Sequence, residues 1–202
     1  MKKYILFLSV LILLTIQPVF AISNVQQCIP LIINGGGEKI DLVFVPDDYL
    51  NDQELFSTDV LSFKTRVLKF IDYESIEGGL FSKEPFKLNK NLFNIYILNI
   101  AEDKNCQVAD ENGGDQWGCK LWAEEKAKLC GSYDSVVVLS NDLSGTGGQS
   151  AYAFTGLDFA QITPFSINKD EALKYPELYI NPWIKTFVHE FGHSFGNLKD
   201  EY

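Results

Sequence analysis

Apolar residues along this chain form short continuous runs, separated by longer stretches in which they recur at helical spacing. The runs at 40–45, 92–100 and 135–139 predict three strands. The stretches at 52–71 and 117–129 between them predict two helices. This alternation of strands and helices indicates an α/β fold, in which helices flank a mostly parallel sheet.

The spacing inside these segments predicts which side chains are buried. The apolar stripe of the first helix recurs at steps of four and three: Phe56, Val60, Phe63, Val67 and Ile71. In the second strand Phe93, Ile95 and Ile97 share one face. The third strand is an apolar run, which predicts that both of its faces are covered. Pro46 is expected to end the first strand.

The last third of the chain predicts a short edge strand at 150–154 and one more helix. Asn181 can cap that helix, and Pro182 suits its first position. We expect the helix to reach Phe195, because Gly196 then supplies a break.

Residues 1–21 have the pattern of a secretory signal peptide. Two lysines precede an apolar stretch at 4–16, and small residues lead to a cleavage site after Ala21. An uncleaved anchor helix is the alternative, but the apolar stretch is shorter than the about 20 residues that span a bilayer. We therefore expect 22–202 to be secreted or extracytoplasmic, with no stable membrane insertion after cleavage.

Four cysteines follow the signal: Cys28, Cys106, Cys119 and Cys130. An even number of cysteines in an exported protein predicts disulfides, and three pairings are possible. Three of the four surround a Gly-rich loop, so we expect at least one bridge to staple that loop. A zinc site built from these thiols is the alternative, although no C-x-x-C pair is present.

The formal net charge of the chain is −10. An acidic surface repels phosphate backbones, which argues against nucleic acid as a partner. The charge balance says little about the fold.

The predicted last helix contains the pentad His189-Glu190-Phe191-Gly192-His193, which holds both histidines of the chain. Residues four apart share one face of a helix, so both imidazoles can reach one ion. Imidazole is a good ligand for Zn²⁺, and the glutamate of H-E-x-x-H holds a metal-activated water as general base. The alternative is two histidines on a helix surface beside an unrelated acidic tail.

A third zinc ligand is expected after Gly196. Lys199 cannot serve while it is protonated. Asp200 offers a carboxylate, which is a legitimate zinc ligand, and Glu201 is the alternative.

Residues 189–202, with the sequence HEFGHSFGNLKDEY, resemble the active-site signature of the IgA-specific metallopeptidase family. The segment 40–49 is similar to the first strand of that family and the turn that follows it. The segments 93–96 and 136–139 and the Gly-rich loop at 145–148 are also similar. The resemblance covers nearly all of the mature chain and implies a metzincin-like catalytic domain with endopeptidase activity.

Carried over to this sequence, the resemblance implies that His189, His193 and Asp200 bind Zn²⁺ and that Glu190 is catalytic. Catalytic domains of this type continue past the signature. We therefore expect 22–202 to be a catalytic half-domain truncated at its C-terminal side, with the active-site helix at its C-terminus.

The sequence thus predicts a secreted zinc-dependent endopeptidase that acts on a protein or peptide substrate, with Glu190 as general base. One alternative is a non-peptidase zinc hydrolase with the same site. The other is an inactive or truncated module that binds zinc or peptide.

Overall fold

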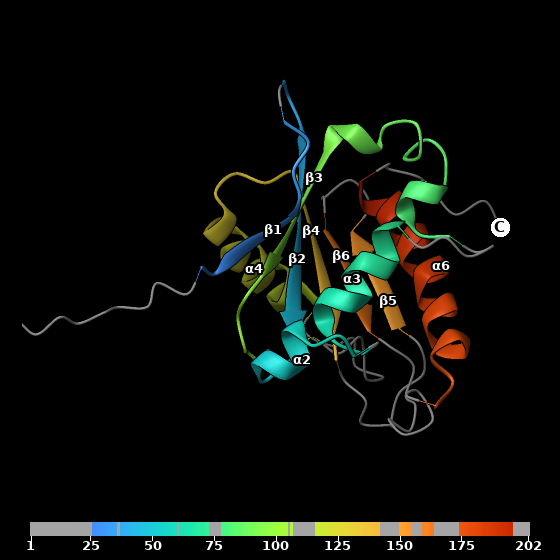
Figure 1. Ribbon diagram of the computed structural model, residues 1–202. Helices are drawn as coiled ribbons and strands as arrows, with labels where there is room; N and C mark the ends of the chain where they lie inside the picture. Colours follow the sequence, from blue (N-terminus) through green and yellow to red (C-terminus); the bar gives the residue numbers. More distant parts are fainter. Residues whose placement is uncertain are drawn as a thin grey trace, which may run out of the picture.

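A six-stranded mixed sheet forms the centre of the part of the chain that the computed structural model describes (Figure 1). That part comprises residues 26–35, 37–59, 61–72, 78–104, 106, 116–141, 150–154, 159–163 and 174–195. The strands are β1 (Cys28–Ile32), β2 (Ile40–Asp47), β3 (Phe93–Leu98), β4 (Ser135–Ser140), β5 (Ser150–Phe154) and β6 (Phe159–Thr163). Their order across the sheet is β1-β3-β2-β4-β6-β5.

Strands β3, β2, β4 and β6 are parallel to one another, and the two outer strands are antiparallel to their neighbours. Parallel neighbours need crossover connections, and helices of the chain supply the cover that such strands require. The predicted α/β class, with a mostly parallel sheet flanked by helices, is therefore confirmed. The predicted edge strand at 150–154 is also confirmed, because β5 is an outer strand.

Helices cover both faces of the sheet. Helices α3 (Phe63–Asp72) and α6 (Pro176–Ser194) lie on one face, and α4 (Gln116–Ala127) lies on the other (Figure 1). Every residue of β4 is buried, and its side chains alternate between the two layers. Val137 and Leu139 pack with α3 and α6, whereas Val136 and Val138 pack with α4. The prediction that this strand is covered on both faces is confirmed.

The single helix predicted at 52–71 was wrong, because the chain forms two helices there. Helix α2 (Asp52–Phe56) ends at Ser57, and α3 starts again at Phe63. The intervening turn is held by side chains: Ser62 Oγ donates to the carbonyl of Ser57 at 2.7 Å, and Asp59 accepts from the N–H of Leu61 at 2.8 Å. Short polar side chains that bond nearby backbone compete with the helix at such positions.

Two predictions based on proline were also wrong. Strand β2 continues through Pro46, which pairs with Leu139 of β4. The pairing of β2 with β3 ends at Phe44, so at Pro46 strand β2 has β4 as its one paired neighbour. The backbone N–H group that proline lacks is therefore not needed for a bond to β3. Helix α6 starts at Pro176 instead of Asn181, so Pro182 is inside the helix and Pro176 occupies its first turn.

Asp47, at the carboxyl end of β2, is fully buried and holds the loop that follows β3. Its carboxylate accepts hydrogen bonds from the backbone N–H groups of Lys104 at 2.9 Å and Cys106 at 3.0 Å. Burial raises the pKa of this carboxyl above its ordinary value of 3.8, and the bonds from the two backbone groups and Ser140 oppose that rise only in part.

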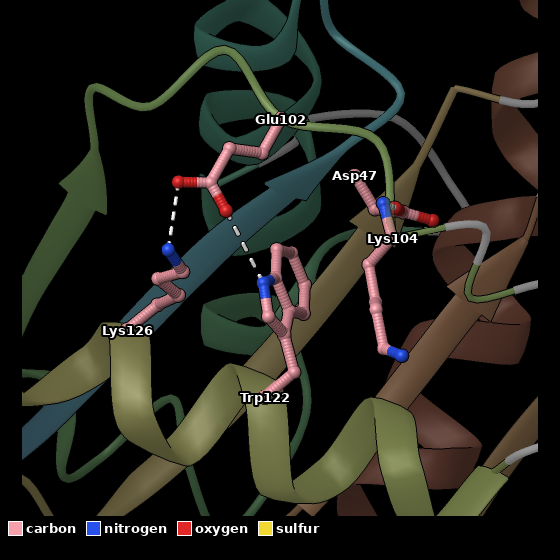
Figure 2. Close-up of polar contacts among 5 residues, drawn as sticks. All are labelled: Asp47, Glu102, Lys104, Trp122 and Lys126. Carbon is pink, nitrogen blue, oxygen red and sulfur yellow. Dashed lines mark hydrogen bonds and ion pairs between the residues drawn. The ribbon is translucent and has the colours of Figure 1, made fainter.

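The same loop is tied to α4 by Glu102. Figure 2 shows its carboxylate between two side chains of the helix. Lys126 Nζ donates to one oxygen at 2.7 Å, and Trp122 Nε1 donates to the other at 3.3 Å. The bond from Lys126 is the main reason that the pKa of Glu102 is lowered.

All four cysteines are paired, as Cys28–Cys130 and Cys106–Cys119. The second bridge joins the loop after β3 to α4, which confirms the prediction that a disulfide staples this region. The first joins β1 to the short 3₁₀ helix at Lys128–Cys130. Because every thiol is oxidised, none of them is left for the alternative zinc site.

The predicted signal peptide, 1–21, lies outside the described residues. Among the residues that are described, no helix has the length and apolar character needed to cross a membrane.

Candidate metal centre

Helix α6 is fixed to the sheet by one apolar face. Ile184, Phe187 and Phe191 recur at steps of three and four, and all three are fully buried. The ring of Phe187 stacks on that of Phe70 with centroids 5.4 Å apart, and it lies 5.8 Å from the ring of Phe44. The helix is thus clamped between α3 and β2 at mid-length.

The end of α6 is anchored by a second aromatic cluster. Phe191 and Phe195 stack with centroids 5.2 Å apart. Phe86 lies 5.5 Å from Phe191, and Phe93 of β3 lies 5.9 Å from Phe195. Aromatic pairs at these distances stabilise beyond their buried area. The turn that carries His193 therefore has a fixed position relative to the sheet.

The two imidazoles lie on the opposite side of α6 from its buried face. His189 is exposed and His193 is half-buried. Their Nε2 atoms are 3.0 Å apart, and the ring planes are nearly perpendicular, with centroids 4.4 Å apart. The predicted juxtaposition of the two histidines on one helix face is confirmed.

This arrangement fits a zinc ion. Two nitrogen ligands at 2.0–2.1 Å in a tetrahedral site are separated by about 3.3 Å. The observed 3.0 Å between the Nε2 atoms is close to that separation, so a small rotation of either ring would place both atoms at ligand distance. At 3.0 Å the two nitrogens are also within hydrogen-bond distance of each other. A proton and a metal ion would therefore compete for the same nitrogen lone pairs.

The rest of the predicted ligand set is not placed. Asp200 and its alternative Glu201 lie outside the described residues, as does Gly196. Within the described part, no group of three or more His, Cys, Asp or Glu residues could hold a metal ion. The structure thus brings together two of the three predicted ligands.

Glu190 lies on α6 between the two histidines and is half-buried. Successive residues of a helix point about 100° apart, so its side chain leaves the helix beside the imidazoles and not along the same line. That position suits a group that acts next to a bound ion without being one of its ligands.

Sequence reasoning missed a pocket of about 310 Å³ beside His189. Its other lining residues are Gly78, Lys83, Lys185 and Val188. The spacing of Lys185, four residues before His189, is a signal that could have found one wall. Lys83 reaches the site only through the fold, and no local pattern marks it.

A scan of the chain against models of known protein families finds no match. A search of curated proteins also finds none.

Proposed function

We propose that this protein is a secreted zinc-dependent endopeptidase of the metzincin-like type, similar to the IgA-specific metallopeptidase family. The observation that carries the proposal is the pair of Nε2 atoms 3.0 Å apart on the outer face of a firmly packed helix. A glutamate lies between the two histidines in sequence, as H-E-x-x-H chemistry requires.

His189 and His193 would hold the metal, with Asp200 as the third ligand. A zinc ion bound there would supply a Lewis acid that lowers the pKa of water and polarises a substrate carbonyl. Both histidines project from one rigid helix, so folding already orients these two ligands. Metal binding then requires little further loss of side-chain entropy.

Glu190 is proposed as the general base. Its carboxylate would accept a proton from the attacking water and then donate that proton to the amine that leaves the cleaved bond. The side chain is half-buried beside the imidazoles, which keeps it close to the reaction without occupying a ligand position.

The two disulfides support an extracytoplasmic location. Disulfides persist in oxidising compartments and are rare in the cytosol. Together with the signal-like pattern at 1–21, they favour a protein that acts outside the cytoplasm.

The proposal is tested by measuring zinc content and cleavage of an unfolded protein substrate on a set of single variants. His189→Ala and His193→Ala should lose zinc. Glu190→Gln should keep zinc and lose about 10²- to 10⁴-fold in cleavage rate, because the amide cannot accept the proton. Glu125→Gln makes the same chemical change on the exposed side of α4 and should leave both quantities unaltered.

Asp200→Asn should weaken zinc binding itself, because it removes a charged ligand. If Glu201→Gln weakens zinc and Asp200→Asn does not, the third ligand is Glu201. Equal cleavage by the wild type and Glu190→Gln would show that the proposed mechanism is wrong. Zinc binding without cleavage of protein would favour the inactive module, or a hydrolase for small amides if those are cleaved.

A further inference from the structure

The two disulfides differ in how far solvent reaches them. Cys106 and Cys119 are 3% and 1% exposed and belong to the apolar core that packs against α4. Cys28 and Cys130 are only partly buried and pack against that core. A disulfide reacts with a thiol only where one of its sulfurs can be reached, so the two bridges offer a thiol unequal access in the folded protein.

An open pocket of about 590 Å³ lies at the Cys28–Cys130 bridge. Both cysteines line it, together with Pro30 of β1, Tyr96 of β3 and Leu129 of the 3₁₀ helix after α4. Leu129 is 43% exposed, so this part of the lining faces solvent. The volume is sufficient for a small organic thiol beside the bridge.

The pocket is also uncharged, in contrast to the chain as a whole. The formal net charge of the chain is −10, whereas none of the described residues that line this pocket is ionised at neutral pH. A thiol reacts as its thiolate anion, which carboxylates in the lining would repel. These lining residues therefore add no repulsion of their own against the reactive form of a thiol.

We propose that Cys28–Cys130 is a thiol-exchange site, at which small thiols react with the folded protein while Cys106–Cys119 stays intact. This inference does not depend on the proposed function. In the first step a thiolate attacks one sulfur of the bridge and forms a mixed disulfide with it. The other cysteine is displaced as a thiolate and takes up a proton.

In the second step another thiolate attacks the sulfur of the bound thiol and releases the remaining cysteine, which is also protonated. Two small thiols are thereby oxidised to one disulfide. Their two electrons and two protons convert the bridge to two cysteine thiols, so the exchange is balanced and is reversed by an oxidised small disulfide.

Reduction at this position has a consequence for the outer strand. Strand β1 has β3 as its neighbour in the sheet, and Cys28–Cys130 is its covalent link to the 3₁₀ helix after α4. The same bridge closes a sequence separation of 102, so its opening returns entropy to the unfolded chain. Exchange at this site therefore couples the stability of the protein to the concentration of thiols around it.

The first measurement compares the two bridges in one folded sample. The oxidised wild type is incubated with cysteamine, quenched with N-ethylmaleimide at intervals and mapped by mass spectrometry. Cys28 and Cys130 should react about tenfold faster than Cys106 and Cys119, or more, at a rate proportional to the cysteamine concentration. Equal rates at the two bridges overturn the proposal. A rate that levels off as cysteamine is increased also overturns it, because the reaction then waits for the protein to unfold.

The second measurement asks whether thiols reach the bridge through the pocket. It compares the exchange rate of anionic mercaptoacetate with that of cysteamine, whose ammonium group is cationic. Leu129→Glu should lower the ratio of the first rate to the second by about twofold to fivefold at low salt, and Leu129→Lys should raise it. The ratio cancels a general loss of folding, because unfolding exposes the bridge to both thiols.

The matched control is Leu121→Glu, at a site on α4 that is 50% exposed and outside the lining of the pocket. This variant should leave the ratio of the two rates at its wild-type value. A ratio that ignores the charge at residue 129, or that responds equally to Leu121→Glu, overturns the proposal.

Discussion

Phe187 illustrates how a single side chain determines the position of the candidate site. It is fully buried and contacts the rings of Phe44, Phe70 and Phe191. These three contacts are between aromatic rings, so they stabilise through buried apolar area and ring packing. The histidines of α6 project from the other side of the same helix, and their position depends on this contact.

Phe187→Ala should lower the free energy of unfolding by about 3–5 kcal/mol, because the surrounding rings cannot close the cavity. Urea denaturation monitored by circular dichroism measures this. Leu88→Ala, at a site that is 79% exposed, should change it by less than about 0.5 kcal/mol. A loss in Phe187→Ala no larger than that of the control would mean that α6 is not held by this ring.

Asp47 predicts a dependence of stability on pH. Burial raises its pKa in the folded protein above 3.8, so the folded state holds this proton more tightly than the unfolded chain does. The stabilisation from protonated Asp47 is complete below pH 3.8 and is lost as the pH rises through the folded-state pKa. The free energy of unfolding of the wild type, minus that of Asp47→Asn, should therefore fall as the pH rises from 3.8. Denaturant titrations at a series of pH values check the sign, and a difference that grows with pH would contradict it.

At the scale of helices and strands, local patterns predicted the centre of the sheet and failed where polar contacts decide. The runs that form β2, β3 and β4 are apolar and bounded by turns, so their pattern is unambiguous. Strand β1 contains a proline, and the apolar residues of β6 do not strictly alternate with polar ones, so neither strand has a clear period. The apolar stripe from Phe56 to Ile71 suggested one helix, because the spacing of apolar residues does not reveal the hydrogen bonds that Ser62 and Asp59 form with the backbone.

The candidate site could also be predicted only in part from local patterns. His189 and His193 could be predicted because a spacing of four on a helix fixes their proximity. The pocket could not, because Lys83 meets α6 only after the segment at Gly79 packs on α3.

Ser62 carries a prediction at this scale, because it separates α2 from α3. Its hydroxyl donates to the carbonyl of Ser57 at 2.7 Å and lies 3.4 Å from the N–H of Thr65 in the first turn of α3. Ser62→Ala removes both contacts and should cost about 1–2 kcal/mol in the free energy of unfolding. Ser82→Ala removes one partly exposed hydroxyl bond and should cost less in the same denaturation assay. If the free energy of unfolding of Ser62→Ala equals that of the wild type, the turn does not need this side chain.

At the scale of the whole molecule, the two disulfides constrain very different lengths of chain. Cys28–Cys130 has a sequence separation of 102, and Cys106–Cys119 has one of 13. Closing a longer loop removes more entropy from the unfolded chain.

Replacing Cys28 and Cys130 by alanine should therefore cost more than replacing Cys106 and Cys119. The chain-entropy relation gives about 4.7 kcal/mol for the long loop and about 3 kcal/mol for the short one. Alanine is chosen over serine because Cys106 and Cys119 are almost fully buried, and a serine there would bury a hydroxyl group. Guanidinium denaturation of the two double variants gives the order, and a larger loss from the short loop would refute the entropic account.

The position of these bridges has a consequence for the order in which the chain assembles. All four bonded sulfurs come from residues up to 130, and β1 to β4 are complete at residue 140. A ribosome makes the chain from its N-terminus, so strands β1 to β4, which are four of the six strands, and both crosslinks can form before α6 has been synthesised. His189 and His193 are the two histidines of the sequence, so a nascent chain at that stage can hold both disulfides but lacks both imidazoles. The proposed metal-binding capacity would then arise only after both disulfides can form.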